Sequence, residues 1–304
     1  MNKKWSIGKV IGIIFLVLFT FVMLLGTFIF LTYLWVNKTN GEIESSGVTR
    51  KYLLYVPESY DPEKATPLII SIHGFVQWPA HQAQISHWNE VADEAGLIVV
   101  YPQGTGFPLR WNTTLGSPDV IFISDLINKL ESEYNIDPQR IFVNGLSNGG
   151  GMSFLLACEM AERIAALGTV AGAYSLPMEK CNPGRPLPVI TFHGTADRIV
   201  PFDGGLESNR GYSLPPIPEW VEQWAVKNGC SLESEDLPPQ GEVSGVRYSG
   251  CEGGVEVVFY TIHGGGHTWP GGEGMPEWIT GKTTQDIDAT RTMWEFFERF
   301  PLDQ

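Results

Sequence analysis

The sequence is short of positive charge. Its 304 residues contain 20 Lys and Arg against 34 Asp and Glu, a formal net charge of -14 at pH 7. This balance offers no basic surface for nucleic acid or for anionic lipid headgroups, so we exclude nucleic acid as a partner. Apolar residues are not scarce: 43% of the chain is hydrophobic, which predicts a packed core rather than disorder.

Cysteine is also scarce, with only four in the chain: Cys158, Cys181, Cys230 and Cys251. None has the close Cys-x-x-Cys spacing of a zinc site, so we expect no such metal site. An even number of cysteines in an exported domain is typical of disulfide pairing. Three pairings are possible, and nearest neighbours close the shortest loops. The alternative is four buried free thiols.

Charge is absent from one long stretch near the amino terminus, the 27 residues from Val10 to Val36. This run exceeds the roughly 20 residues that cross a bilayer, and no small-x-small cleavage site follows it. Lys3, Lys4 and Lys9 precede the run, which predicts a cytoplasmic amino terminus. We therefore expect a signal anchor that places the rest of the chain outside the cytoplasm, with its apolar helix in the lipid bilayer. A cleaved secretory signal is the alternative.

The remaining sequence shows no internal repeat and no second-domain boundary. We expect an anchor over residues 1–36, a polar linker over 37–48 and a single domain over 49–304. Apolar runs predict buried strands over 52–56, 68–72, 97–101, 141–143, 165–171, 187–192 and 255–262. Helical periodicity is found over 86–95, 121–134, 219–226 and 288–300. The alternation predicts an α/β fold with a mostly parallel sheet covered by helices on both faces. Reacting groups in such folds lie beyond the carboxyl ends of the strands.

One motif joins a predicted strand to a predicted helix: Gly145-Leu146-Ser147-Asn148-Gly149. A Gly-x-Ser-x-Gly sequence in that context is the nucleophile elbow, in which the serine occupies a strained turn and its hydroxyl is exposed. The backbone N–H of Asn148 then points to the place where negative charge develops. The alternative is a chance glycine turn, since the chain has 34 glycines. The strand before the motif and the helix after it favour the elbow.

Two further polar residues follow predicted strands. Asp197 lies in the loop after the strand over 187–192, and His267 lies in a glycine-rich loop after the last strand. His267 can take a proton from Ser147 while Asp197 fixes its tautomer, and Asp203 is the substitute acid. The pair His263 and His267 also fits a His-x-x-x-His metal motif, but that motif requires a helix, and three intervening glycines argue against one. We expect His263 to be structural.

The order Ser, Asp, His along the chain is that of the α/β-hydrolases. The early strand end His73-Gly74-Phe75 supplies the missing part, because the backbone N–H of Phe75 is placed to be the second oxyanion donor. We expect His73 to pack beneath that loop. Three aromatic residues near the expected site are candidates for stacking on substrate, with core packing as the alternative reading: Trp78, Trp111 and Trp269.

From about residue 51 to 300 the chain resembles exported esterases, the polyhydroxybutyrate depolymerase-like and feruloyl esterase proteins. The matching stretches are Gly145 to Gly150, Leu156 to Glu159, His193 to Asp197, Gly265 to Pro270, Tyr101 to Gly104, Trp111-Asn112 and Asn228 to Cys230. The resemblance implies a serine ester hydrolase without cofactor or metal, with Ser147, Asp197 and His267 as its triad. It also implies disulfides Cys158–Cys181 and Cys230–Cys251.

The resemblance implies substrates that are phenolic or acetyl esters of plant polysaccharide, or short hydroxyalkanoate polyesters. Two features depart from the family pattern: Phe75 stands where many members have cysteine, and a membrane anchor is unusual for enzymes that degrade insoluble polymer. A tethered enzyme suits soluble oligosaccharide or oligoester fragments that diffuse to the cell. Two other functions are kept as alternatives, a serine peptidase on the same fold and a catalytically silent binding protein.

Overall fold

The computed structural model describes residues 7–205 and 213–302. The chain divides into two units, Met1–Lys38 and Thr39–Gln304. Helix α1 (Ile7–Val36) makes up the described part of the first unit. Its segment Ile11–Phe28 has a mean hydropathy of 2.7 with none of it buried, and it is long and apolar enough to cross a membrane.

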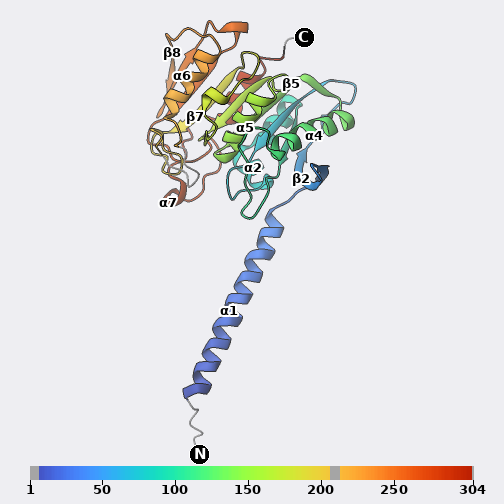
Figure 1. Ribbon diagram of the computed structural model, residues 1–304, viewed down its shortest axis with the longest axis vertical. Helices are drawn as coiled ribbons and strands as arrows, with labels where there is room; N and C mark the ends of the chain where they lie inside the picture. Colours follow the sequence, from blue (N-terminus) through green and yellow to red (C-terminus); the bar gives the residue numbers. More distant parts are fainter. Residues whose placement is uncertain (1–6, 206–212, 303–304) are drawn as a thin grey trace, which may run out of the picture. The chain divides into compact units, whose positions relative to one another are not determined.

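The second unit is built on one sheet of ten strands (Figure 1). In spatial order these are β1 (Gly41–Ser45), β2 (Val48–Tyr55), β4 (Ile98–Pro102), β3 (Thr66–Ile72), β5 (Ile136–Leu146), β6 (Ala166–Val170), β7 (Val189–Gly194), β10 (Val257–Ile262), β9 (Val243–Tyr248) and β8 (Glu235–Gln240). The central strands, from β4 to β10, run parallel. The outer pairs β1–β2 and β8–β9 are antiparallel additions at the two edges. This confirms the predicted α/β fold with a mostly parallel sheet.

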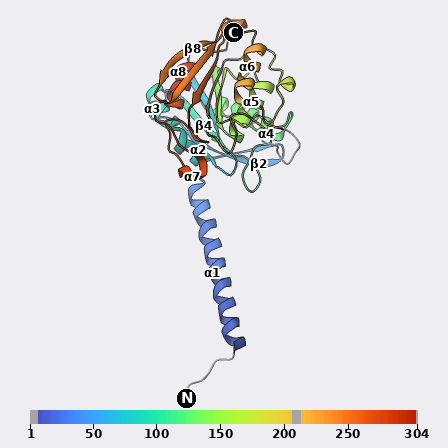
Figure 2. The ribbon, with the colours of Figure 1, turned by 90° about the vertical axis from the view of Figure 1, so that its left-hand side faces the viewer.

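Helices cover both faces of the sheet (Figure 2). One face carries α4 (Pro118–Glu133), α5 (Asn148–Glu159) and α6 (Ile217–Lys227), and the other carries α2 (Pro79–Ser86), α3 (Trp88–Ala95) and α8 (Ala289–Phe297). Shorter helical segments are η1 (Met178–Lys180), η2 (Glu252–Gly254) and α7 (Glu277–Thr280). Side chains alternate across the strands: Leu68 and Ile70 pack in the core beneath α4, α5 and α6, while Ile69 packs in the core beneath α2, α3 and α8. A strand buried on both faces must be apolar throughout, as β3 is.

Three segments differ from the expected layout. Residues 37–48 were expected to be a linker, yet Gly41–Ser45 forms β1 and pairs with β2. An edge strand needs only one buried face, so the single apolar residue Ile43, packed against the core, suffices. Strands β8 and β9 were not predicted, because β8 is almost wholly exposed and contains two prolines. The helix expected over 86–95 is α3, which begins at Trp88; the helix before it, α2, was not predicted and is separated from α3 at His87, whose φ is 55°.

Candidate active site

Ser147 lies between β5 and α5 in a sharply turned conformation, with φ 57° and ψ -120°. Positive φ is costly for a residue with a Cβ, so the surrounding structure must hold it there. Its N–H donates to the carbonyl of Val170 at 3.0 Å, and its carbonyl accepts from Gly151 and Ala173 at 3.0 Å each. The serine is thus fixed by three backbone hydrogen bonds at the carboxyl edge of the sheet.

The glycines that flank Ser147 are required by close approach of the backbone. A Cβ on Gly145 would lie 2.5 Å from the carbonyl carbon of Gly149, and a Cβ on Gly149 would overlap the carbonyl of Ile72. Real Cβ atoms do not approach backbone so closely, so any side chain at either position would displace the elbow from β3. The geometry is that of the nucleophile elbow.

The turn after β3 lies directly against the serine. A Cβ on Gly74 would be 3.3 Å from the Cβ of Ser147. Gly74 N–H donates to Gln77 Oε1 at 2.8 Å, and Val76 N–H donates to Leu109 O at 2.9 Å. Between them, the N–H of Phe75 meets no acceptor in the described part of the chain.

Asn148 is the first residue of α5, so its N–H has no partner within the helix. It carries the partial positive charge of a helix amino terminus. Together with the N–H of Phe75, it provides two donors beside Ser147, the arrangement that an oxyanion requires.

A buried network of hydrogen bonds around His73 and Trp111 supports the turn after β3. His73 donates from Nδ1 to the carbonyl of Gly74 at 2.7 Å and accepts at Nε2 from Gly104 N–H at 3.0 Å. Burial lowers the pKa of His73 to about 4, so the ring is neutral at pH 7. The indole N–H of Trp111 donates to His73 O at 2.9 Å, and the Trp111 N–H donates to Asn148 Oδ1 at 2.8 Å. His73 therefore packs beneath the oxyanion loop, as expected.

His267 and Asp197, the expected base and acid, meet at the same edge of the sheet. His267 Nδ1 donates to Asp197 Oδ2 at 2.7 Å, and both side chains are buried. Oδ1 of Asp197 accepts from Ile199 and Val200 N–H groups at 2.8 Å each. His267 lines a narrow pocket together with Leu146, the residue before the serine. The loops after β5, β7 and β10 thus converge on one point.

A second histidine contacts Asp197, and the sequence analysis assigned it no role in the site. His193, in β7, lies with Nε2 3.4 Å from Asp197 Oδ2 and 2.8 Å from the carbonyl of Val200, to which it donates. Burial by itself raises the pKa of the Asp197 carboxyl. The hydrogen bonds from His193 and His267 more than offset it and hold that pKa well below its usual range. Asp197 is therefore ionised at pH 7.

Other candidate residues lie elsewhere. Asp203 is exposed, and the acid that contacts His267 is Asp197. His263 is exposed and exchanges a hydrogen bond with Ser244 Oγ at 2.9 Å. Within residues 7–205 and 213–302, no group of three or more His, Cys, Asp or Glu side chains is placed to hold a metal ion.

The structure corrects two of the three expected substrate contacts. Trp111 and Trp269 are each 2% exposed. Trp111 donates to His73 O, and Trp269 donates its indole N–H to Thr290 Oγ1 at 2.9 Å. Both side chains are therefore packed and hydrogen-bonded inside the protein, which favours the core-packing alternative. Trp78 is half-buried beside His81, and its contact with substrate stays a prediction.

Both expected disulfides are formed, Cys158–Cys181 and Cys230–Cys251. The first joins the carboxyl end of α5 to the segment after η1, and so it fixes the far end of the helix that begins at the serine.

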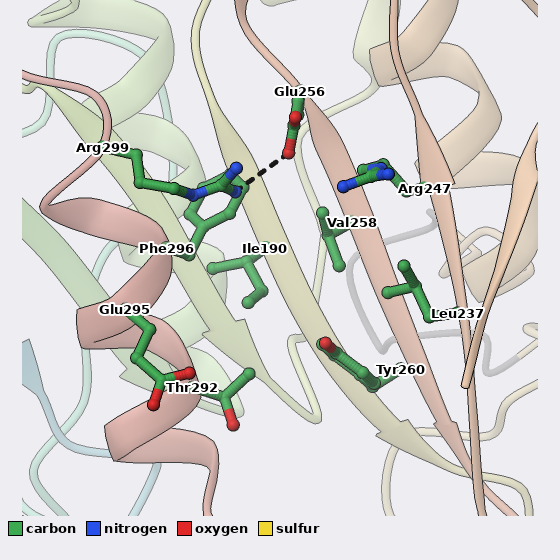
Figure 3. A pocket seen from close by; sticks show the side chains of 10 residues that line it. All are labelled: Ile190, Leu237, Arg247, Glu256, Val258, Tyr260, Thr292, Glu295, Phe296 and Arg299. Atoms are coloured by element: carbon green, nitrogen blue, oxygen red, sulfur yellow. Dashed lines mark hydrogen bonds and ion pairs between the residues drawn. The ribbon is translucent and has the colours of Figure 1, made fainter. Parts of the chain in front are cut away.

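A pocket of about 300 Å³ lies away from the triad, between α8 and the strands β7, β10, β9 and β8 (Figure 3). Its lining residues Ile190 and Val258 are each the second residue of their strands, so the pocket lies on the face of the sheet, away from the carboxyl edge. Both arginines that line it are paired, Arg299 with Glu256 at 2.9 Å and Arg247 with Glu235 at 2.6 Å. No residue of the triad lines it.

Comparison with known proteins agrees with this geometry. The family described as "Esterase PHB depolymerase" matches residues 50–176. Feruloyl esterase B of Piromyces equi is 32% identical over 242 residues, which are 75% of this chain and 44% of that enzyme. Probable feruloyl esterase C of Aspergillus clavatus is 30% identical over 75% of this chain and 78% of that protein. This chain belongs to the family of PHB depolymerase-like and feruloyl esterases.

A solved structure has a similar fold. The acetyl xylan esterase of Aspergillus awamori superposes with a TM-score of 0.61 at 15% identity, over 85% of this chain and 98% of that one. At this identity the likeness concerns the fold alone. This chain spans less than half of the length of the Piromyces enzyme.

Proposed function

We propose that this esterase-family protein hydrolyses carboxylic esters through an acyl-serine intermediate. The observation that carries the proposal is the 2.7 Å hydrogen bond from His267 Nδ1 to an ionised Asp197 at the sheet edge where Ser147 occupies a nucleophile elbow. With its proton on Nδ1, His267 keeps Nε2 free to act as base.

The proposed reaction has two halves. Ser147 Oγ attacks the ester carbonyl while His267 Nε2 takes its proton, and the N–H groups of Phe75 and Asn148 hold the developing oxyanion. His267 then gives the proton to the leaving alcohol. Water attacks the acyl-serine by the same route and releases the acid. Each step uses groups of this chain, so the proposed reaction requires no cofactor.

The proposed substrates are feruloyl or acetyl esters of plant polysaccharide fragments, or short polyhydroxyalkanoate esters. The relatives are named feruloyl esterases, which supports feruloyl esters as substrates. The family name, PHB depolymerase, supports polyhydroxyalkanoate esters. The position of the site on loops at a sheet edge suits an ester carried on a larger fragment.

The proposed location is the outer side of a membrane, with α1 as a single-pass anchor. The apolar length of α1 and the absence of burial along Ile11–Phe28 support a span. Two disulfides support a compartment outside the cytoplasm.

The test is turnover by the full chain in mild detergent on p-nitrophenyl acetate and butyrate, methyl ferulate, acetylated xylan fragments and a hydroxybutyrate oligomer. Ser147→Ala is expected to lose at least ~10³-fold in kcat, because the nucleophile is removed while binding remains. Ser132→Ala, at an exposed serine on α4, is the matched control and keeps wild-type turnover. Failure of folded wild-type protein on every ester would refute the esterase and bring the peptidase and binding-protein functions forward.

A further inference from the structure

Six exposed apolar side chains lie on the segments that follow β3 and β4, and in or next to helix α7. Phe107 is 90% exposed and Trp278 is 85% exposed. The others are between 40% and 53% exposed, and we call the whole set the apolar rim: Phe75, Val76, Phe107, Met275, Trp278 and Ile279. Single exposed apolar residues are ordinary, but several on adjoining loops indicate a surface that meets an apolar partner.

Hydrogen bonds place the two halves of the rim beside the catalytic groups. On one side, Val76 N–H donates to Leu109 O, so the oxyanion turn is joined to the loop that carries Phe107. On the other side, His267 N–H donates to Thr280 O, the last residue of α7, so Trp278 and Ile279 border the base. The mouth of the site is flanked by apolar groups on both sides.

The amino-terminal connection enters the catalytic unit at the same edge of the sheet. Gly41 of β1 lies opposite Tyr52 of β2, and Tyr52 lies opposite Pro102, the last residue of β4. β4 is parallel to β3 and β5, so Pro102 marks the carboxyl edge at which Ser147 lies. In the strand order, β1 is four strands from β5, about 19 Å at the usual strand spacing.

The connection itself is short. α1 ends at Val36, and β1 begins at Gly41. An extended chain covers at most about 3.5 Å per residue, so this connection reaches no further than roughly 17 Å. If α1 spans a bilayer, this short connection also keeps the carboxyl edge of the sheet, where β1 begins, close to the bilayer surface.

We propose that the apolar rim docks on the lipid bilayer that α1 spans, so that the mouth of the active site opens at the membrane surface. Trp side chains are favoured at the lipid–water boundary, and Phe side chains are common on surfaces that insert into it, so both of the most exposed rim residues suit that boundary. The formal charge of -14 disfavours anionic headgroups, so the partner is a zwitterionic lipid surface.

Docking also narrows the proposed substrate class. A mouth at the bilayer admits small amphipathic esters that collect at the interface, such as short feruloylated fragments, and it excludes long polymer chains. This consequence rests on the proposed esterase function, whereas the docking itself rests on the proposed membrane span.

The test measures depth in lipid for the full chain in phosphatidylcholine nanodiscs. Single substitutions Phe107→Cys, Trp278→Cys, Leu18→Cys and Leu232→Cys each receive a nitroxide label, and collision with oxygen is compared with collision with a water-soluble nickel chelate. Leu18 lies inside the apolar span and is the lipid reference. Leu232 is the aqueous control. It is 54% exposed and near Asn228, which bonds Leu187 just before β7, at the opposite edge of the sheet.

The expected result is that labels at 107 and 278 show an oxygen preference between those of the labels at 18 and 232, as a site at the lipid–water boundary requires, while the label at 232 stays in water. Labels at 107 and 278 that match the one at 232 would overturn the docking and leave the span intact. A label at 18 in water would overturn the span and the docking with it. None of these outcomes depends on turnover, so a failure of the esterase proposal is detected separately in the substrate panel.

Discussion

Asp197→Asn is the substitution that probes the triad most finely, because the new side chain has nearly the same shape. Oδ1 of Asp197 accepts from the N–H groups of Ile199 and Val200, and Oδ2 accepts from His267 Nδ1. The amide oxygen of an asparagine would stay with the two backbone donors. Its NH2 group would then face His267 Nδ1, which must become an acceptor.

The proton of His267 would then reside on Nε2, the nitrogen that has to receive the proton of Ser147. The carboxylate that stabilises the imidazolium is lost at the same time. Where both effects act in a serine triad, kcat falls by about 10⁴-fold, which corresponds to about 5 kcal/mol of activation free energy. We expect a loss of this size with little change in KM, because Asp197 is buried behind the base and does not face substrate.

The assay is initial-rate hydrolysis of p-nitrophenyl acetate between pH 6 and 9. Asp203→Asn is the matched control, since Asp203 is exposed and lies outside the triad, and it keeps wild-type kcat. A loss of less than tenfold in Asp197→Asn, in protein whose unfolding midpoint is unchanged, would refute the assignment of Asp197 as the orienting acid.

Three further predictions concern stability. Burial lowers the pKa of His73 to about 4, so below about pH 6.5 the unfolded chain binds a proton at this residue that the folded chain does not bind. The wild-type protein should therefore lose about 2 kcal/mol of unfolding free energy between pH 7 and pH 5. His73→Gln should remove this contribution to the pH dependence of the unfolding free energy. An unchanged slope in urea titrations would contradict this. Replacing Cys158 and Cys181 by alanine opens a loop with a sequence separation of 23 and should lower the free energy of unfolding by about 3 kcal/mol. The measurement is a lower Tm than that of the wild type under oxidising conditions. Asp119→Asn leaves the buried Arg50 guanidinium, 2.8 Å away, without its partner and should cost about 3–5 kcal/mol in urea unfolding, whereas a cost below 1 kcal/mol would show that the pair is not structural.

Much of the candidate site could be predicted because its residues lie in short sequence motifs next to predicted strands. Ser147 lies in a glycine-flanked motif between a strand and a helix, and Asp197 and His267 follow apolar strands at the sheet edge where such groups meet. In the structure His267 donates a hydrogen bond to Asp197, and His267 lines a pocket together with Leu146, the residue before Ser147. The parallel core strands were equally clear, since strands buried on both faces are apolar throughout.

The parts that sequence missed depend on contacts between distant segments. His193 looks like any strand residue until the loop after β7 folds back and places Asp197 beside it. Trp111 and Trp269 were reasonable candidates for substrate contact, and only tertiary packing shows that His73 and Thr290 occupy their indole N–H groups. Strand β8 has no apolar pattern because pairing with β9, and not burial, holds it at the edge.

The most direct test of the central claim is covalent labelling of the nucleophile. Full-length protein is treated with a p-nitrophenyl phosphonate ester and digested, and the modified residue is located by mass spectrometry. The account predicts one phosphonyl group per chain on Ser147, released nitrophenol in equal amount and loss of esterase activity in proportion, with no labelling of Ser147→Ala. Activity that survives full labelling of Ser147, or a label that falls on another residue as activity is lost, would contradict it.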